Sequence, residues 1–468
     1  MKRLLLILAL IVLVLLAGYS GARLYTGQML ETEVEQLAGE LALIEDIDLQ
    51  GLRYEPGLYH GNLVYDVRVR LPAGHPLLDL ARLSAPDRVP QWLTLQGTAR
   101  ISQGPHFTPD GVVLAWAEQS WNGLHLRAGL KPSGTILGSL QGDAVQGTFE
   151  DPLAGTLQVD LSAWDGDFQW RPEAQQLTLA AQIRQLVVGE ADFQGELHNA
   201  TTEFDFSFDS PDQWHSRSRL TADRLELSSD VSGTRLQDAI IITEFNRSGD
   251  RIDNRLEVTL GESLVEQIDW YSGELRLALS DLDADAWMAL LEELATGSAD
   301  RQFTPERQDR LLRISDELLA AGPTVNIERL AFRLYEDSNA YDLAGAMHLQ
   351  LPSGTGSTLI DPVDLLENAE IRLSLLASLG AIRRISEWRA EADARALAEE
   401  QNIIRTEEQI QRAAATMYRT TLLSLRFMPL VTVEGGKAET HLEMRQGEVY
   451  RNGERVMPVT QVLRLFGF

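Results

Sequence analysis

The sequence predicts a mainly β protein that begins with a membrane-spanning helix. Three observations support this fold class: an uncharged apolar stretch near the N-terminus, apolar and polar residues alternating with a period of two over most of the chain, and two regions with the period of a helix. With 468 residues, 44% of them hydrophobic, the chain can bury a sizeable core. We expect an N-terminal transmembrane helix and amphipathic stalk, an elongated antiparallel β-sheet body, a helical hairpin insertion and a long charged helical region near the C-terminus.

The first element is the apolar stretch Leu4–Ala22, which contains no charged residue. Nineteen residues at about 1.5 Å each span roughly 28 Å, close to the hydrocarbon thickness of a bilayer. Lys2 and Arg3 precede the stretch, so the positive-inside rule places the N-terminus in the cytoplasm and the rest in the periplasm. We expect a single-pass anchor in a bacterial inner membrane. A cleaved signal peptide is the alternative, because Ser20-Gly21-Ala22 offers the small residues that a signal peptidase requires.

The second element is an amphipathic stalk over residues 23–46. Leu30, Val34, Leu37 and Leu41 recur there at helical spacing, which predicts that the helix continues beyond the membrane. Its apolar stripe is expected to pack on the body of the protein or on a partner.

The third element is a β-rich region over residues 47–280. Leu93, Leu95, Ala99 and Ile101 alternate with polar residues, and the same pattern recurs in Leu124–Leu130 and several later segments. Strand follows strand without an intervening helix, which argues against a parallel, doubly wound sheet. Three dipeptides are typical of two-residue hairpin turns: Asn122-Gly123, Asp165-Gly166 and Asn452-Gly453.

Two helical regions interrupt the strands. The first has an apolar face at Ala284, Trp287, Leu291 and Leu294, and a second helix follows between Thr304-Pro305 and Gly322-Pro323, which indicates a helical hairpin. The second region has no glycine or proline between Ala381 and Met428. It forms either one rod of roughly 70 Å or two helices separated at Gln401-Asn402. Its apolar stripe is Ile382, Ile385, Trp388, Ala392 and Ala396.

The predicted organisation has seven segments. They are 1–22 (anchor), 23–46 (stalk), 47–280 (β-rich), 281–323 (helical hairpin), 324–378 (β-rich), 379–428 (charged helical region) and 429–468 (C-terminal strands).

Composition excludes several classes of function. A net charge of -28 with no basic run disfavours nucleic-acid binding, and it disfavours anionic ligands as well. The absence of cysteine excludes disulfides, thiolate metal sites, cysteine nucleophiles and a lipoprotein anchor.

The sequence contains no motif of a serine hydrolase, a P-loop protein, a dinucleotide-binding protein or a zinc protease. No residue is therefore assigned a catalytic, cofactor-binding or metal-binding role, and we expect a protein that is not an enzyme. The eight histidines are scattered and are expected on the surface or in turns: His60, His75, His106, His125, His198, His215, His348 and His441.

One acidic cluster resembles a calcium loop. Asp281, Asp283 and Asp285, with Glu292 as the twelfth residue, match its start and end, but Ala286 occupies the position that requires glycine. Carboxylates at the start of a helix explain the cluster better. The second acidic candidate, Asp165-Gly166-Asp167, is interpreted as a turn.

Two groups of side chains have alternative interpretations. Arg217, Arg219 and Arg224 either meet lipid phosphate or form a solvated face that balances Asp212 and Asp223, and we favour the solvated face. Five tryptophans fill a core or line a lipid groove, which alternation alone cannot distinguish: Trp116, Trp121, Trp164, Trp170 and Trp214.

Three short motifs resemble those of a known family. They are the Tyr-x-x-Gly turn in residues 54–59, Gln103-Gly104-Pro105 where that family has His-Gly-Pro, with His106 displaced beyond the proline, and the final strand and Asn-Gly turn in residues 447–453. On these motifs and the layout, the chain resembles the YdgA-like family of bacterial inner-membrane proteins, a domain of unknown function. The resemblance implies an uncleaved anchor and a periplasmic β-rich body, and no catalytic residue. A looser architectural likeness to AsmA-type envelope proteins suggests a lipid-holding β groove.

Two functions follow as hypotheses. In the first, the β body binds a lipid or other apolar ligand near the membrane. In the second, the protein is a structural or assembly module, whose stalk and charged helical region recruit envelope protein partners.

Overall fold

A computed structural model describes residues 28, 30–32, 34–35, 38–39, 47–57, 60–70, 92–108, 111–121, 124–151, 155–190, 193–210, 212–229, 233–265, 268–297, 305–335, 342–352, 368–401 and 403–461. Several predicted features lie outside the described residues: Leu4–Ala22, His75, Asn122-Gly123 and the side chains of Leu95, Trp121 and Glu292. In the part of the chain that is described, no helix combines the length and hydropathy needed to cross a bilayer.

The protein is mainly β, as predicted, and every pairing described between its strands is antiparallel. The chain divides into two compact units, which are considered separately, and the division falls within β11 (Phe193–Ser210). The strands of unit 1 are β1 (Ile47–Glu55), β2 (His60–Arg70), β3 (Trp92–Thr108), β4 (Gly111–Trp121), β5 (Leu124–Leu130), β6 (Ile136–Gly142), β7 (Val145–Asp151), β8 (Gly155–Leu161), β9 (Trp164–Arg171) and β10 (Gln176–Glu190).

In unit 1 the strands from β1 to β6 pair in sequence order, and β6 then pairs with β9. β9 lies along the first half of β10, and β8 lies along its second half, so the β7–β8 hairpin extends the sheet past the end of β9. The prediction of a hairpin turn at Asp165-Gly166 was wrong, and with it the turn assigned to Asp165-Gly166-Asp167. These residues lie inside β9, because pairing on both sides, with β6 and β10, outweighs the local preference of the dipeptide.

The first strands of unit 1 are held by Tyr54, which connects two of the family-like motifs. Its ring lies across Gly61, where a Cβ would come within 2.1 Å of the phenol oxygen, and its hydroxyl accepts a hydrogen bond from the fully buried Gln103. Only glycine fits at position 57, just after β1, because a Cβ there would lie 2.2 Å from the carbonyl oxygen of His60. Tyr54 forms a small core with Ile101 and neighbouring side chains.

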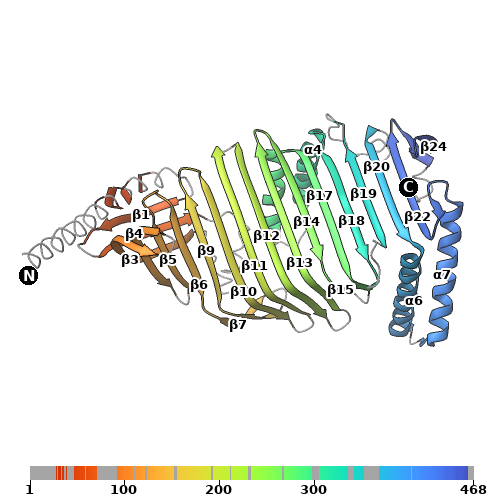
Figure 1. Cartoon of the computed structure of the whole chain (residues 1–468), viewed down its shortest axis with the longest axis horizontal. Helices are drawn as coiled ribbons and strands as arrows, with labels where there is room; N and C mark the ends of the chain where they lie inside the picture. Colours follow the sequence, from red (N-terminus) through yellow and green to blue (C-terminus); the bar gives the residue numbers. More distant parts are fainter. Residues whose placement is uncertain are drawn as a thin grey trace, which may run out of the picture. The chain divides into compact units, whose positions relative to one another are not determined.

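Unit 2 is likewise built mainly from antiparallel strands (Figure 1). Its strands are β12 (Gln213–Ser229), β13 (Gly233–Ser248), β14 (Arg251–Leu260), β15 (Ser263–Val265), β16 (Ile268–Trp270), β17 (Ser272–Asp283), β18 (Thr324–Arg333), β19 (Leu343–Gln350), β20 (Glu370–Ser378), β21 (Thr432–Glu434), β22 (Lys437–Arg445), β23 (Glu448–Arg451) and β24 (Glu454–Pro458). The pairing order is β12–β13–β14–β17–β18–β19–β20–β22–β23–β24, with β15 beside β13 and β21 beside β22.

The two faces of the unit 2 sheet differ in polarity. Cross-strand partners on one face form a row across seven strands: Thr243, Leu256, Leu277, Ile327, Met347, Leu373 and Leu442. Their neighbours along the chain point to the opposite face, where Arg255 pairs with Glu328 at 2.9 Å and Arg329 pairs with Glu274 at 2.7 Å. One face is therefore apolar and the other is covered with ion pairs.

Helices α3 (Ala284–Gly297) and α4 (Pro305–Ala320) lie where the change of period indicated a helical hairpin. The account of the aspartates as helix-start residues is confirmed for Asp283, whose Oδ1 accepts a hydrogen bond from the amide of Ala286 at 2.9 Å. Asp281 has a positive φ of 61°, and Asp285 lies 3.6 Å from the guanidinium of Arg247.

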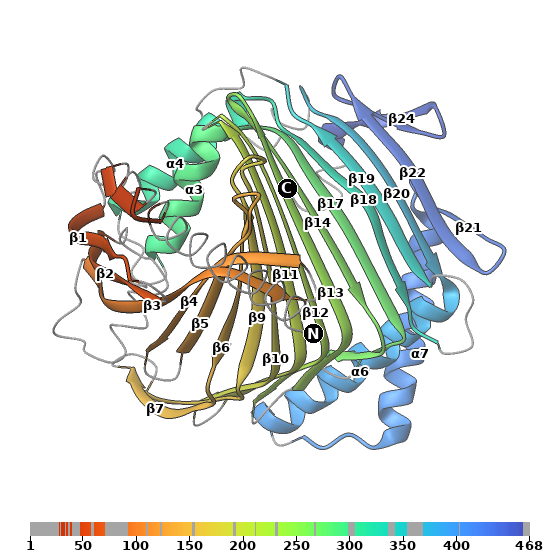
Figure 2. The same cartoon turned by 60° about the vertical axis from the view of Figure 1, so that its left-hand side comes forward.

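The charged helical region forms two helices, α6 (Leu379–Gln401) and α7 (Glu407–Phe427), so the break at Gln401-Asn402 is the correct alternative. They lie side by side at the β20–β22 end of the sheet (Figures 1 and 2). The start of α7 carries a signal that was missed, because Thr406 and Gln409 form a capping box of the Thr-x-x-Gln type.

The predicted apolar stripe of α6 needs correction. Its buried face follows a spacing of four residues, Ile382, Ser386, Ala390 and Ala394, whereas Ile385 and Ala396 are exposed. A different side of α6 contacts α7, where the guanidinium carbon of Arg383 lies 5.7 Å from the centroid of the Tyr418 ring. At the C-terminal end, the turn predicted at Asn452-Gly453 is confirmed, with φ of 50° and 83°.

The Tyr54–Gln103 contact predicts that Tyr54→Phe lowers the free energy of unfolding by about 1–3 kcal/mol, because a fully buried amide loses its acceptor. Replacing both partners, in Tyr54→Phe/Gln103→Leu, should recover most of the loss in urea unfolding experiments. A double variant less stable than the single one would contradict this.

Burial raises the pKa of the Tyr54 phenol above 10.0; the Gln103 hydrogen bond opposes this shift and the charge of Glu31 adds to it. The contribution of the protonated phenol to the free energy of unfolding is fully present below pH 10 and is lost as the pH rises through the folded-state pKa. Above pH 10, the free energy of unfolding should therefore fall less for Tyr54→Phe than for wild type.

Candidate functional site

The main candidate site is an apolar pocket in unit 1 with a volume of about 700 Å³. Its floor is the sheet, where cross-strand partners from four strands form one row: Ala115 of β4, Leu130 of β5, Ile136 of β6 and Trp170 of β9. A second row runs through Ile101, Ala117 and Ala128. Three of these seven side chains are alanines, so the hollow lies over methyl groups between larger neighbours.

Two residues of the predicted stalk form part of the wall. The described residues between 28 and 39 are helical, and Leu30 and Val34, one turn apart, line the pocket. Both also pack against the core around Tyr54 and Ile101. The stalk's stripe therefore packs on the body of the protein at these two residues, while Leu37 and Leu41 lie outside the described residues.

Polar groups reach the pocket only from turns, as far as the described lining residues show. Lys131 and Ser133 belong to the turn between β5 and β6, and Glu173 belongs to the turn between β9 and β10. The first turn is closed by backbone hydrogen bonds from Lys131 to the carbonyl of Thr135 at 2.8 Å and from Gly134 to that of Lys131 at 3.0 Å. Gly134 adopts a φ of 77°, which favours glycine. The pocket therefore has an apolar floor and a polar end.

The tryptophans that the sequence placed in a core or a groove divide between different environments. Trp170 lines the pocket. Trp164 lies across Gly142, where a Cβ would come within 2.0 Å of the indole nitrogen. Trp214 packs against the core around Ile252 in unit 2.

The remaining sequence candidates near the pocket do not line it. Trp116 lies on the opposite face of β4, with the guanidinium carbon of Arg127 4.3 Å from the ring centroid. Leu126 shares a strand face with Ala128 but is not among the lining residues.

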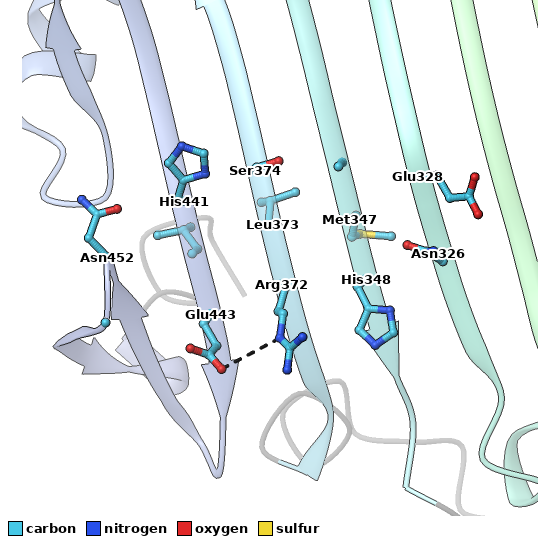
Figure 3. A pocket seen from close by; sticks show the side chains of 13 residues that line it. Asn326, Glu328, Met347, His348, Arg372, Leu373, Ser374, His441, Glu443 and Asn452 are labelled. Carbon is cyan, nitrogen blue, oxygen red and sulfur yellow. Dashed lines mark ion pairs between the residues drawn. The ribbon is translucent and has the colours of Figure 1, made fainter.

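A second depression, of about 380 Å³, lies on the ion-pair face of unit 2 and is lined by charged residues together with apolar ones such as Met347 and Leu373 (Figure 3). Arg372 of β20 lies between His348 of β19 and Glu443 of β22, and its guanidinium is 4.0 Å from the Glu443 carboxylate. His441 enters from the neighbouring row beside Ser374. Because acidic and basic groups are mixed here, the depression favours neither a positively nor a negatively charged ligand. No group of three or more metal-binding side chains occurs among the described residues.

Scatter along the sequence does not keep every histidine apart in the fold, as His348 and His441 show. They are 93 positions apart, and the β19–β20–β22 pairing brings them to one depression. His125 and His198 pair instead with nearby acids, at 3.8 Å from Asp143 and 2.9 Å from Glu196.

The arginines of β12 form part of a surface network. Arg217 pairs with Glu244 at 3.2 Å, and Arg224 lies 3.6 Å from Glu226. Arg219 is exposed. The solvated face favoured by the sequence is thus present, but the acids that pair with Arg217 and Arg224 differ from those expected, Asp212 and Asp223. Cross-strand register places Glu244 opposite Arg217, whereas Arg224 and Glu226 lie two positions apart on one face of β12.

The fold and the pocket define a mainly β protein with an amphipathic hollow on one sheet face. A family model described as a bacterial protein of unknown function (DUF945) matches residues 1–459 of the chain, and the chain belongs to this family. No curated protein and no solved structure matches it.

Proposed function

We propose that this protein is a non-enzymatic envelope protein, anchored in the bacterial inner membrane by its N-terminal helix, whose periplasmic β body holds a lipid or other apolar ligand. The observation that supports it best is the pocket of unit 1, with its floor of aliphatic and aromatic side chains. A volume of about 700 Å³ is within the usual range of ligand pockets, roughly 300–1,000 Å³. The three family-like motifs support the further proposal that this is the YdgA-like family.

The chemistry of the floor favours an alkyl chain over a polar ligand. A polar ligand needs converging donors and acceptors, which the rows around Leu130 and Ala128 do not offer. Burying roughly 300 Å² of alkyl surface contributes about 7 kcal/mol before the costs of association, enough for measurable binding.

The apolar face of unit 2 is a second surface of the same chemistry. Its rows of leucine, isoleucine and methionine are half-buried, and Leu375 is 45% exposed. This face supports the proposal that unit 2 also binds alkyl chains.

We expect Ala128→Phe to fill the pocket and abolish retention of lipid. The test is mass spectrometry of lipid that copurifies with the full-length chain. Ala180→Phe is the matched control, because Ala180 is an exposed strand residue that does not line the pocket. Circular dichroism should show both variants folded. A wild-type protein free of lipid, or an Ala128→Phe variant that keeps the same lipid, would refute the proposal.

The anchor is supported by the length and uncharged composition of Leu4–Ala22 and by the basic residues before it. N-terminal sequencing of the protein extracted from membranes should recover a chain that retains these residues. A mature chain that begins at Arg23 would instead identify a cleaved signal peptide.

A second candidate function, an assembly module, is favoured by the surface of the α6–α7 pair. Ile404 in the connection between the helices is 83% exposed, and Phe427 at the end of α7 is 84% exposed. Each has an exposed apolar neighbour, since Ile403 is 48% exposed and Leu423, about one turn before Phe427, is 54% exposed. Exposed apolar side chains that group together are typical of contact sites for a partner protein.

For this module we expect a photo-crosslinking amino acid at position 404 or 427 to give a discrete protein adduct in living cells. The same amino acid at Arg412, an exposed position on α7, should give none. Equal yields at all three positions would argue against a specific partner.

A further inference from the structure

The geometry points to the ligand's chemical class: we propose that the unit 1 pocket binds an acyl chain with a single negative charge on its head group, and that Lys131 pairs with that head group. This inference rests on the proposed function, because it names the ligand of the same pocket.

The first support is the distribution of polarity within the pocket. The two rows of the floor consist of apolar side chains, such as Ile101 and Trp170. The charged groups come instead from the two turns at one end. A ligand that satisfies both parts has an alkyl chain and a polar head. A plain hydrocarbon would leave the charged end unused, and it would also desolvate Lys131 without compensation.

The second support is the state of Lys131 itself. It is one of only three lysines, it is half-buried, and it makes no ion pair within the described part of the chain. Arg127, four positions earlier in β5, is by contrast held by Glu118 at 3.3 Å and by the ring of Trp116. Among the described residues, Lys131 is therefore a cation at the pocket that is not engaged in an ion pair.

The net charge of -28 made anionic ligands unfavourable from composition alone. That argument concerns the long-range electrostatic field of the whole protein, which salt screens beyond about 8–10 Å. Inside the pocket the nearest charges decide, and these are Lys131 and Glu173. A pocket whose described lining offers one cation and one acid favours a head group of one negative charge over a head group of two, because Glu173 opposes the second charge.

The experiment uses photo-crosslinkable probes on the full-length chain in nanodiscs of zwitterionic lipid. A diazirine analogue of palmitic acid is compared with the matching analogue of hexadecanol, which has the same chain without the charge. The readout is the probe concentration that half-labels the peptides around residues 124–136. A lysophosphatidylglycerol probe tests whether the head group is a phosphate diester, and a lysophosphatidic acid probe tests a doubly charged head.

We expect Lys131→Met to raise the half-labelling concentration of the acid roughly five- to tenfold, as for a partly buried ionic hydrogen bond, and to leave that of the alcohol unchanged. Lys131→Arg should keep the wild-type value, and Lys437→Met, which removes an exposed lysine in β22, should have no effect. Glu173→Gln should improve labelling by the doubly charged probe more than by the acid. Preferential labelling by the acid or by lysophosphatidylglycerol identifies the source of the head group.

The failures are distinguishable. If wild type is labelled by both acid and alcohol and Lys131→Met changes neither, or weakens both equally, the role of Lys131 is refuted and the apolar pocket stands. If neither probe labels these peptides in wild type, the proposed function fails together with this inference.

Discussion

Antiparallel pairing is the constraint on which the rest of this protein depends. Because side chains alternate between faces with a period of two, one register decides the face of every residue in a strand. In unit 2 this places Leu256, Leu277 and Met347 in one row and the paired charges of Arg255 and Glu328 on the other side. In unit 1 the same rule aligns Ala115, Leu130 and Ile136 into the floor of the pocket.

Within that constraint, small residues create the features of interest. Gly61 lets the Tyr54 ring lie flat on β2, so that its hydroxyl reaches Gln103 across the sheet. Alanines at 117 and 128 leave the hollow that the helical residues Leu30 and Val34 help to enclose. A larger side chain at Gly61 would clash with the Tyr54 ring, whereas one at Ala117 or Ala128 would fill the hollow.

The pocket and the depression of unit 2 contrast in their chemistry. The pocket separates apolar from charged groups, which suits an amphiphile whose two parts require different surroundings. In the depression, Arg372 and two histidines are mixed with carboxylates, so attraction and repulsion nearly balance for either sign of charge. Separation of polarity, more than the number of polar groups, is the property of the unit 1 pocket on which the proposed ligand class rests.

The sequence by itself determined the mainly β class, the positions of several strands such as β3 and β5, the account of Asp283 at the start of α3 and the turn at Asn452-Gly453. These features depend on neighbours in the chain, through the period of hydrophobic residues, the free amides at a helix start and the φ values of turn residues. Only the tertiary structure decided that Asp165-Gly166 lies within a strand and that α6 buries Ala390 and Ala394.

The candidate site was also decided by the tertiary structure. Alternation showed that Ala128 and Leu130 share a face, but the partners of that face come from segments up to about a hundred positions away, such as Leu30 and Trp170. Lys131 and Glu173 meet the same pocket, and His348 and His441 the same depression, because of strand order and register. Contacts between strands distant in sequence depend on which edges pair, and no local pattern of residues encodes that choice.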